Sequence, residues 1–160
     1  MNIDTILGRL NYHGVQYLLI GGVNFLLRHR PVLTFDLDLW LEPEPANRRR
    51  CERALADLEA AWGPTEQEWR PAREWPEGWL DRQELFCLTS PAGAIDVFQS
   101  VRGLSAWTTC HARSVTVVTA AGTSCRALSD ADMLACQLAL DPADRKEDRI
   151  RALREALGTP

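Results

Sequence analysis

Residues 18–42 read LLIGGVNFLLRHRPVLTFDLDLWLE and contain the strongest structural signals in the chain. The apolar run 17–20 ends at Gly21 and Gly22, which predicts a short buried strand followed by a tight turn. Residues 23–29 predict a helix, because the proline that follows shortly after cannot continue it. The order of strand, glycine turn and helix therefore predicts an α/β arrangement.

Residues 32–41 predict a second strand, in which apolar and polar side chains alternate. In a strand, successive side chains point to opposite faces of the sheet. Five apolar side chains are therefore expected in the core: Leu33, Phe35, Leu37, Leu39 and Leu41. The opposite face is expected to present the carboxylates of Asp36 and Asp38, with Trp40 beside them.

Asp36 and Asp38 would lie about 6.6 Å apart along such a strand, so their oxygens can converge on one divalent cation. Without a cation, the two charges repel each other and destabilise the strand. The solvated face of an edge strand is the more common explanation of an isolated Asp-x-Asp pair. The neighbouring residues therefore decide whether this pair indicates a binding site.

Two further features favour a binding site. Gly21 and Gly22 allow a phosphate to approach the backbone at the N-terminus of the predicted helix. Asp96 lies between two apolar residues of another predicted strand, so it is expected to point away from the core, as the aspartate pair does. Three carboxylates beside a phosphate-binding turn are typical of metal-assisted phosphoryl transfer.

The remaining sequence predicts further helices and strands around this centre. Residues 63–82, the tryptophan-rich segment, predict an ordered loop packed by aromatic side chains. Helices are expected at 4–13, 46–61, 129–140 and 144–157, and strands at 84–89, 94–100, 114–119 and 124–127. We expect a single domain over residues 1–160: a mixed β-sheet flanked by helices to about 128, then a C-terminal helical pair at about 129–157.

The composition is that of a globular protein, because 46% of the 160 residues are hydrophobic and 25% are charged. The net charge of −4 argues against a dedicated sequence-independent DNA-binding protein. The five cysteines form no Cys-x-x-Cys pair, which indicates reduced thiols in a cytoplasmic protein. No apolar run is long enough to span a bilayer and no secretory signal is visible, so no membrane partner is expected.

Three segments resemble the nucleotidyltransferase superfamily. Residues 18–42 match its order of strand, glycine turn, helix and Thr-x-Asp-x-Asp, and residues 93–107 (GAIDVFQSVRGLSAW) are similar to its third-aspartate strand. Residues 126–153 (RALSDADMLACQLALDPADRKEDRIRAL) resemble the C-terminal helices of small bacterial nucleotidyltransferases related to the AbiEii toxins. The resemblance covers nearly the whole chain, apart from the tryptophan-rich segment, and implies the nucleotidyltransferase fold.

The resemblance also implies a site and a reaction. Asp36 and Asp38 would bind the Mg²⁺ or Mn²⁺ ions that hold a nucleoside triphosphate (NTP). Asp96 would complete the metal site and help to deprotonate an acceptor hydroxyl. The acceptor oxygen would attack the α-phosphate, so that nucleoside monophosphate (NMP) moves to the acceptor and pyrophosphate leaves. The nucleotide-binding residues implied near the aspartates are Gly21, Gly22 and Thr34.

The chain departs from the family pattern at two positions. Val32 stands where relatives often carry an arginine, and Gln137 stands where they often carry a lysine that balances the charge of the triphosphate. Arg145 and Lys146 match the basic cluster that opens the last helix, and they are expected to bind nucleotide in compensation. Their alternative role is an exposed helix face paired with the two acidic residues that follow.

The sequence does not identify the acceptor of the nucleotide. It is tRNA or a protein, as in toxin–antitoxin relatives with a cognate antitoxin or regulator, or a small molecule such as an antibiotic. We favour a macromolecule, because the C-terminal helices resemble the toxin-related group. The basic run Arg48–Arg50 is more typical of a solvated helix face, paired with Glu52 and Asp57, than of a nucleic-acid contact. The rival hypothesis is a catalytically silent nucleotide-binding or antitoxin-like interaction module, which Gln137 favours.

Overall fold

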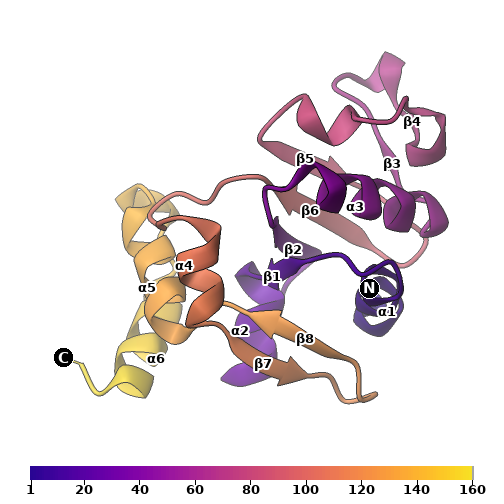
Figure 1. Ribbon diagram of the computed structural model, residues 1–160. Coiled ribbons are helices and arrows are strands. Elements are labelled where there is room, and N and C mark those ends of the chain that lie inside the picture. Colours follow the sequence, from indigo (N-terminus) through magenta and orange to yellow (C-terminus); the bar gives the residue numbers. More distant parts are fainter. Residues whose placement is uncertain (160) are drawn as a thin grey trace.

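The computed structural model describes residues 1–159, and its centre is a six-stranded mixed sheet (Figure 1). The strands are β1 (Tyr17–Leu19), β2 (Asp36–Leu41), β5 (Leu85–Leu88), β6 (Ala94–Phe98), β7 (Val115–Val118) and β8 (Ser124–Ala127). Their order across the sheet is β5-β6-β2-β1-β8-β7. Because β2 runs parallel to β6, the two strands that contain the predicted aspartates lie side by side.

Helices cover the sheet, and the predicted mixed α/β class is confirmed. They are α1 (Ile3–Tyr12), α2 (Gly21–Arg28), α3 (Pro45–Asp57), α4 (Trp107–Ala112), α5 (Asp130–Ala139) and α6 (Glu147–Leu157). Short 3₁₀ turns lie at Glu66–Glu68, Ala72–Glu74, Trp79–Asp81 and Pro142–Asp144, and β3 (Ala61–Trp62) pairs with β4 (Arg70–Pro71) in a separate small sheet. The C-terminal pair of helices is α5 and α6, whereas α4 was not predicted. None of the helices within residues 1–159 is both long and apolar enough to cross a membrane.

Two hydrophobic cores lie on opposite faces of the sheet. Leu37, Leu39 and Leu41 point from β2 into the larger core, which also contains residues of α1 and α3. Leu18 and Trp40 belong to a smaller core that includes residues of α4, α5 and α6. Figure 1 shows these three helices gathered on one side, away from α1 and α3. The C-terminal helices thus cover part of the sheet face that bears the aspartates.

Strand β2 is shorter than the sequence predicts, because it begins at Asp36. The first residue of β6 is Ala94, which pairs with Asp36, and no strand within residues 1–159 pairs with 32–35. The side chains of Leu33 and Phe35 are consequently 79% and 76% exposed. The prediction that these two residues lie in the core is wrong, whereas the three leucines of β2 itself are buried as predicted.

Aromatic rings pack the tryptophan-rich segment, as predicted. The Trp62 ring lies 5.0 Å from the ring of Trp75 and 5.6 Å from that of Trp79. Trp62 belongs to β3 and not to the preceding helix, because α3 ends at Asp57, four residues earlier than predicted. The backbone turns after the helix at Glu59, which adopts a left-handed conformation with φ of 52°.

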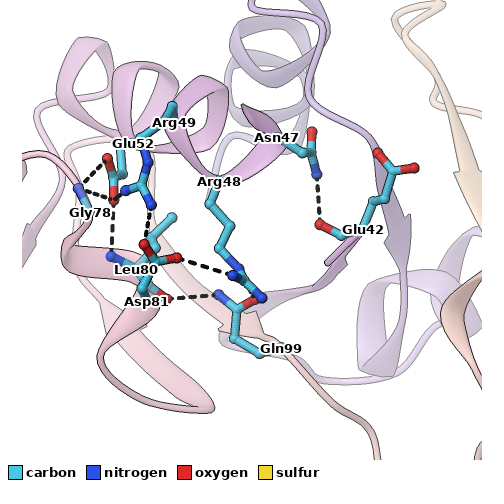
Figure 2. A network of polar contacts seen from close by, with 9 residues as sticks. All are labelled: Glu42, Asn47, Arg48, Arg49, Glu52, Gly78, Leu80, Asp81 and Gln99. Carbon is cyan, nitrogen blue, oxygen red and sulfur yellow. Dashed lines mark hydrogen bonds and ion pairs between the residues drawn. The ribbon is translucent and has the colours of Figure 1, made fainter. Parts of the chain in front are cut away.

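A network of polar contacts joins the tryptophan-rich segment to α3 (Figure 2). Glu52 on α3 is 7% exposed and accepts hydrogen bonds from the backbone N–H groups of Gly78 (3.1 Å) and Leu80 (3.0 Å). Arg49 forms ion pairs with Glu52, at 2.6 Å, and with Asp81. The buried carboxylate of Glu52 therefore adds polar contacts with α3 to the aromatic packing that holds this segment.

The basic run that begins at Arg48 is part of this network. Arg48 Nε donates a hydrogen bond to Gln99 Oε1 at 3.0 Å, just beyond the end of β6. The predicted pairing of the run with Glu52 is confirmed. The predicted pairing with Asp57 is wrong, because Asp57 lies instead 2.8 Å from His13, the residue that follows α1. Two of the three arginines form ion pairs, so the run leaves little unpaired charge for a nucleic acid.

The two C-terminal helices begin at well-defined residues. Ser129 caps α5, because its hydroxyl oxygen accepts a hydrogen bond from the Asp132 N–H at 3.2 Å. The last helix begins at Glu147, three residues later than predicted, because Pro142–Asp144 forms a 3₁₀ turn. It ends at Leu157, and the next residue, Gly158, adopts the left-handed conformation that terminates many helices.

A candidate functional site of three carboxylates

Asp36, Asp38 and Asp96 lie together on one face of the sheet, so the predicted clustering is confirmed. Asp38 on β2 pairs in register with Asp96 on the parallel strand β6, and Asp36 lies two residues away along β2. One carboxylate oxygen of each residue lies within 4.8 Å of those of the other two. The register between β2 and β6 therefore brings Asp96 beside two carboxylates that are far from it in the sequence.

The first turn of α2 lies against this cluster. Gly21 adopts a left-handed conformation, with φ of 64°, and a Cβ atom there would lie 1.8 Å from Asp38 Oδ2. The Gly22 N–H donates a hydrogen bond to the same oxygen, at 3.4 Å. Both the backbone angle and the close contact exclude a side chain at position 21. The glycine turn thus places a helix N-terminus, which favours anions, beside the carboxylates.

Thr34 also lies at this site, just before β2 begins. A Cβ atom on Gly22 would lie 2.4 Å from Thr34 Oγ1, so these two residues pack closely. The Thr34 hydroxyl donates to the Asp36 carbonyl oxygen (3.3 Å) and lies 3.4 Å from the Asp36 carboxylate. The structure therefore brings together six of the predicted site residues: Gly21, Gly22, Thr34, Asp36, Asp38 and Asp96.

Burial and mutual repulsion disfavour the ionised forms of two of the carboxylates. Burial, followed by the charges of Asp36 and Asp96, raises the pKa of Asp38 to about 6. The Gly22 N–H and the charge of Arg149 oppose this rise. The pKa of Asp96 is also raised, chiefly by its burial. A cation bound between the carboxylates would remove the repulsion, because it favours their charged forms.

A cavity of about 480 Å³ opens beside Asp38 and Gly21, between the sheet and the C-terminal helices. Its polar lining includes Gln137 on α5 and Arg149 on α6. Its walls are mainly apolar and include Phe25, Phe98, Val101, Met133, Leu140 and Leu153. An apolar cavity of this size with a few polar groups is typical of a small-molecule site.

The last helix places Arg149, rather than Arg145 or Lys146, at this cavity. The Arg145 guanidinium donates to the carbonyl oxygens of Leu138 (2.8 Å) and Leu140 (3.1 Å), which satisfies the C-terminal end of α5. Lys146 is exposed, and neither residue lines the cavity. Within residues 1–159, neither forms the expected ion pairs with the acidic residues that follow. The structure therefore places both of these predicted nucleotide-binding residues away from the site.

Cys87 is a neighbour of the cluster that the sequence analysis did not identify. It lies on β5 and pairs in register with Asp96 on β6. Partial burial, followed by the charge of Asp96, raises the pKa of its thiol to about 11. The thiol is therefore neutral near pH 7 and adds no charge to the site. The tight turn between β5 and β6 fixes this register, and that turn is the sequence signal for the position of Cys87.

Asp38 should make the stability of the metal-free protein depend on pH. Its pKa rises from 3.8 to about 6 on folding, so between these values the folded state binds a proton that the unfolded state releases. This contribution to stability should fall as the pH rises through that window. We expect the thermal midpoint of Asp38→Asn to exceed that of the wild type increasingly from about pH 4 to pH 6. Calorimetry with a chelator present measures this difference, and a difference independent of pH would contradict the raised pKa.

Comparison with known proteins assigns no family to the chain. No protein-family model matches the chain, and a comparison with curated proteins likewise gave no match. The features that bear on function are therefore the convergence of Asp36, Asp38 and Asp96, the glycine turn that contacts them, and the adjoining cavity.

Proposed function

We propose that the chain is a metal-dependent nucleotidyltransferase, which moves NMP from an NTP to an acceptor hydroxyl. The observation that supports this most strongly is the convergence of three carboxylates within 4.8 Å, beside the N-terminus of α2. Metal-assisted phosphoryl transfer requires carboxylates for hard divalent cations and a nearby place for phosphate oxygens. The aspartate cluster and the turn at Gly21 and Gly22 suit these two requirements.

The donor set suits Mg²⁺ or Mn²⁺. Carboxylate oxygens are the ligands that these hard cations prefer in proteins. The pKa of Asp38 is raised first by burial and then by the negative charges of Asp36 and Asp96, and a bound cation would offset both effects. Cations held there by Asp36, Asp38 and Asp96 would neutralise charge on the triphosphate and on the phosphoryl group being transferred.

Each aspartate has a role in this proposal. Asp36 and Asp38 hold the cations, and the Thr34 hydroxyl fixes the orientation of Asp36. Asp96 would complete the cation site and accept the proton of the acceptor hydroxyl. The acceptor oxygen forms a bond to the α-phosphorus, the bond from that phosphorus to the bridging oxygen breaks, and pyrophosphate leaves.

The cavity beside Asp38 is the proposed site of the nucleoside. Its volume of about 480 Å³ and its mainly apolar walls suit a nucleobase and ribose. Phe25 and Phe98 supply aromatic surface there. The mixed sheet and the C-terminal pair α5 and α6 agree with the resemblance to the nucleotidyltransferase superfamily and its AbiEii-related members.

Transfer of a labelled nucleotide tests this proposal. The purified protein, with Mg²⁺ and NTPs labelled in the α-phosphate, should label one of three acceptor pools: tRNA, cell protein, or aminoglycoside and lincosamide drugs. A chelator should abolish the transfer, because the aspartates need a cation to hold the triphosphate. Labelled tRNA would indicate a nucleic-acid acceptor, and its binding should weaken steeply with salt. Labelled protein would indicate a target protein or a cognate antitoxin.

Two negative results have different meanings. Binding of an NTP with Mg²⁺, but no transfer to any pool, would favour the rival function of a catalytically silent nucleotide-binding or antitoxin-like module. Failure to bind any of the four NTPs in calorimetric titration would overturn both the enzyme and the nucleotide-binding module, and only the antitoxin-like module would remain.

A further inference from the structure

Arg149 presents a positive charge at the edge of the carboxylate cluster. Its Nη2 atom would lie 3.5 Å from a Cβ atom on Gly22, and its guanidinium lies 5.7 Å from the centre of the Phe25 ring. Its charge favours ionisation of Asp38, and its side chain lines the cavity beside that residue. Arg149 therefore lies where the cavity, the glycine turn and the aspartate cluster meet.

The Arg149 guanidinium is also free to bind a ligand. Within residues 1–159 it forms neither a hydrogen bond nor an ion pair, and its ring contact is with Phe25. Other arginines near the C-terminal helices have acidic partners: Arg28 pairs with Asp130 at 2.8 Å, and Arg102, which also lines the cavity, pairs with Asp141 at 3.9 Å on the exposed surface. An arginine has five N–H donors in a planar arrangement that matches phosphate oxygens.

Gln137 fixes the start of the helix that contains Arg149. The Gln137 Oε1 atom accepts a hydrogen bond from the Lys146 N–H at 3.0 Å. The Lys146 carbonyl oxygen accepts one from the Arg149 N–H at 2.9 Å, in the first turn of α6. Both Gln137 and Arg149 line the cavity. The glutamine amide thus connects α5 to the turn that directs Arg149 toward the cavity.

We propose that Arg149 binds the polyphosphate chain of the nucleotide, and that Gln137 is a positioning residue that acts through it. The inference rests on the proposed function and names the phosphate-binding cation, because Arg145 is engaged at the end of α5 and neither Arg145 nor Lys146 lines the cavity. Phosphate oxygens between the guanidinium and the first N–H groups of α2 meet donors from both sides. The positive charge then comes from α6, and no lysine is needed at position 137.

The variant Arg149→Met tests the role of the guanidinium, because methionine keeps an apolar side chain against Phe25. In calorimetric titration with Mg²⁺ it should bind NTPs and inorganic tripolyphosphate about 10-fold to 100-fold more weakly than wild type, the loss expected for charge-assisted hydrogen bonds. Binding of unphosphorylated nucleosides should not change, and Arg149→Lys should recover part of the loss. The control Arg151→Met removes the same charge from a side chain of α6 that is 66% exposed, and it should bind like wild type.

A double-mutant cycle tests the positioning role of Gln137. Gln137→Met removes the acceptor of the Lys146 N–H with little change in volume. It should weaken tripolyphosphate binding in the wild-type background but not in the Arg149→Met background, because the two residues act on one interaction. An equal loss in both backgrounds would overturn the positioning role.

The outcomes separate this inference from the proposed function. If wild type binds NTPs with Mg²⁺ and Arg149→Met binds them equally well, the inference is overturned and the proposed function stands. If wild type binds no NTP, both are overturned. Circular dichroism and the thermal midpoint establish that each variant is folded. Arg149→Gln, which keeps a polar side chain of similar reach, provides the same comparison if the methionine variant unfolds.

Discussion

The double variant Asp36→Asn and Asp38→Asn should lose nucleotidyl transfer while it keeps its fold. Each asparagine keeps the shape of the side chain but removes a negative charge that a cation needs. Because cations contribute several kcal/mol of charge stabilisation in such transition states, the transfer rate should fall by at least about 10³-fold. The metal-free variant should have the same or a higher thermal midpoint, because its repulsion with Asp96 is smaller.

A charge-matched control separates this effect from a change in net charge. Glu66→Gln with Glu74→Gln removes two charges from exposed positions in the tryptophan-rich segment, and this variant should transfer nucleotide like wild type. Mg²⁺ with an NTP should raise the thermal midpoints of wild type and control, but not that of the aspartate variant. If the aspartate variant unfolds, the role of the pair is structural. If the variant is folded and still transfers label, the pair takes no part in the chemistry.

The carboxylate site could be predicted because the alternation of a strand is a local property. Asp36 and Asp38 share one face of β2 whatever the strand pairs with, and Asp96 lies between two buried residues of β6. The start of β2 depends instead on its register with β6, in which Asp36 pairs with the first residue of β6, and no local pattern encodes that register. Leu33 and Phe35 continue the alternation but have no partner strand, so they are exposed.

Which basic residue lies beside the site depends on where α6 begins. A helix from residue 144 would place Arg145 and Lys146 in its first turn. The 3₁₀ turn at Pro142–Asp144 delays the helix, so both residues precede it. Arg149 lies four residues before the buried Leu153, and residues at this spacing share a helix face. That spacing was the sequence signal for Arg149 at the cavity.

The tryptophan-rich segment has no periodicity from which its contacts could be predicted. Its backbone N–H groups at Gly78 and Leu80 are satisfied by Glu52, a residue of a helix that ends long before them in the sequence. Cys51 and Leu55 are four residues apart on α3, a spacing that places both on one helix face, and both are buried. The same pattern gives no reason to expect a buried carboxylate, because charged residues are rarely buried without partners.

Glu52→Ala should therefore lower the free energy of unfolding by about 3–5 kcal/mol, the usual cost of removing one partner of a buried ion pair. Glu52 is 7% exposed, and its loss leaves Arg49 and the N–H groups of Gly78 and Leu80 without their acceptor. Glu52→Gln keeps one acceptor oxygen and should cost less. Glu44→Ala, an exposed change at the start of the same helix, should cost no more than about 0.5 kcal/mol.

The loss at Glu52 should shift one cooperative transition rather than release the tryptophan-rich segment alone. The network continues from Leu80, whose carbonyl oxygen accepts a hydrogen bond from Gln99 at 3.2 Å, to the end of β6, the strand that contains Asp96. Urea unfolding followed by tryptophan fluorescence and by far-ultraviolet circular dichroism should give coincident curves for wild type and Glu52→Ala. An earlier fluorescence transition in the variant would show that the segment unfolds independently, and that the network does not connect it to the sheet.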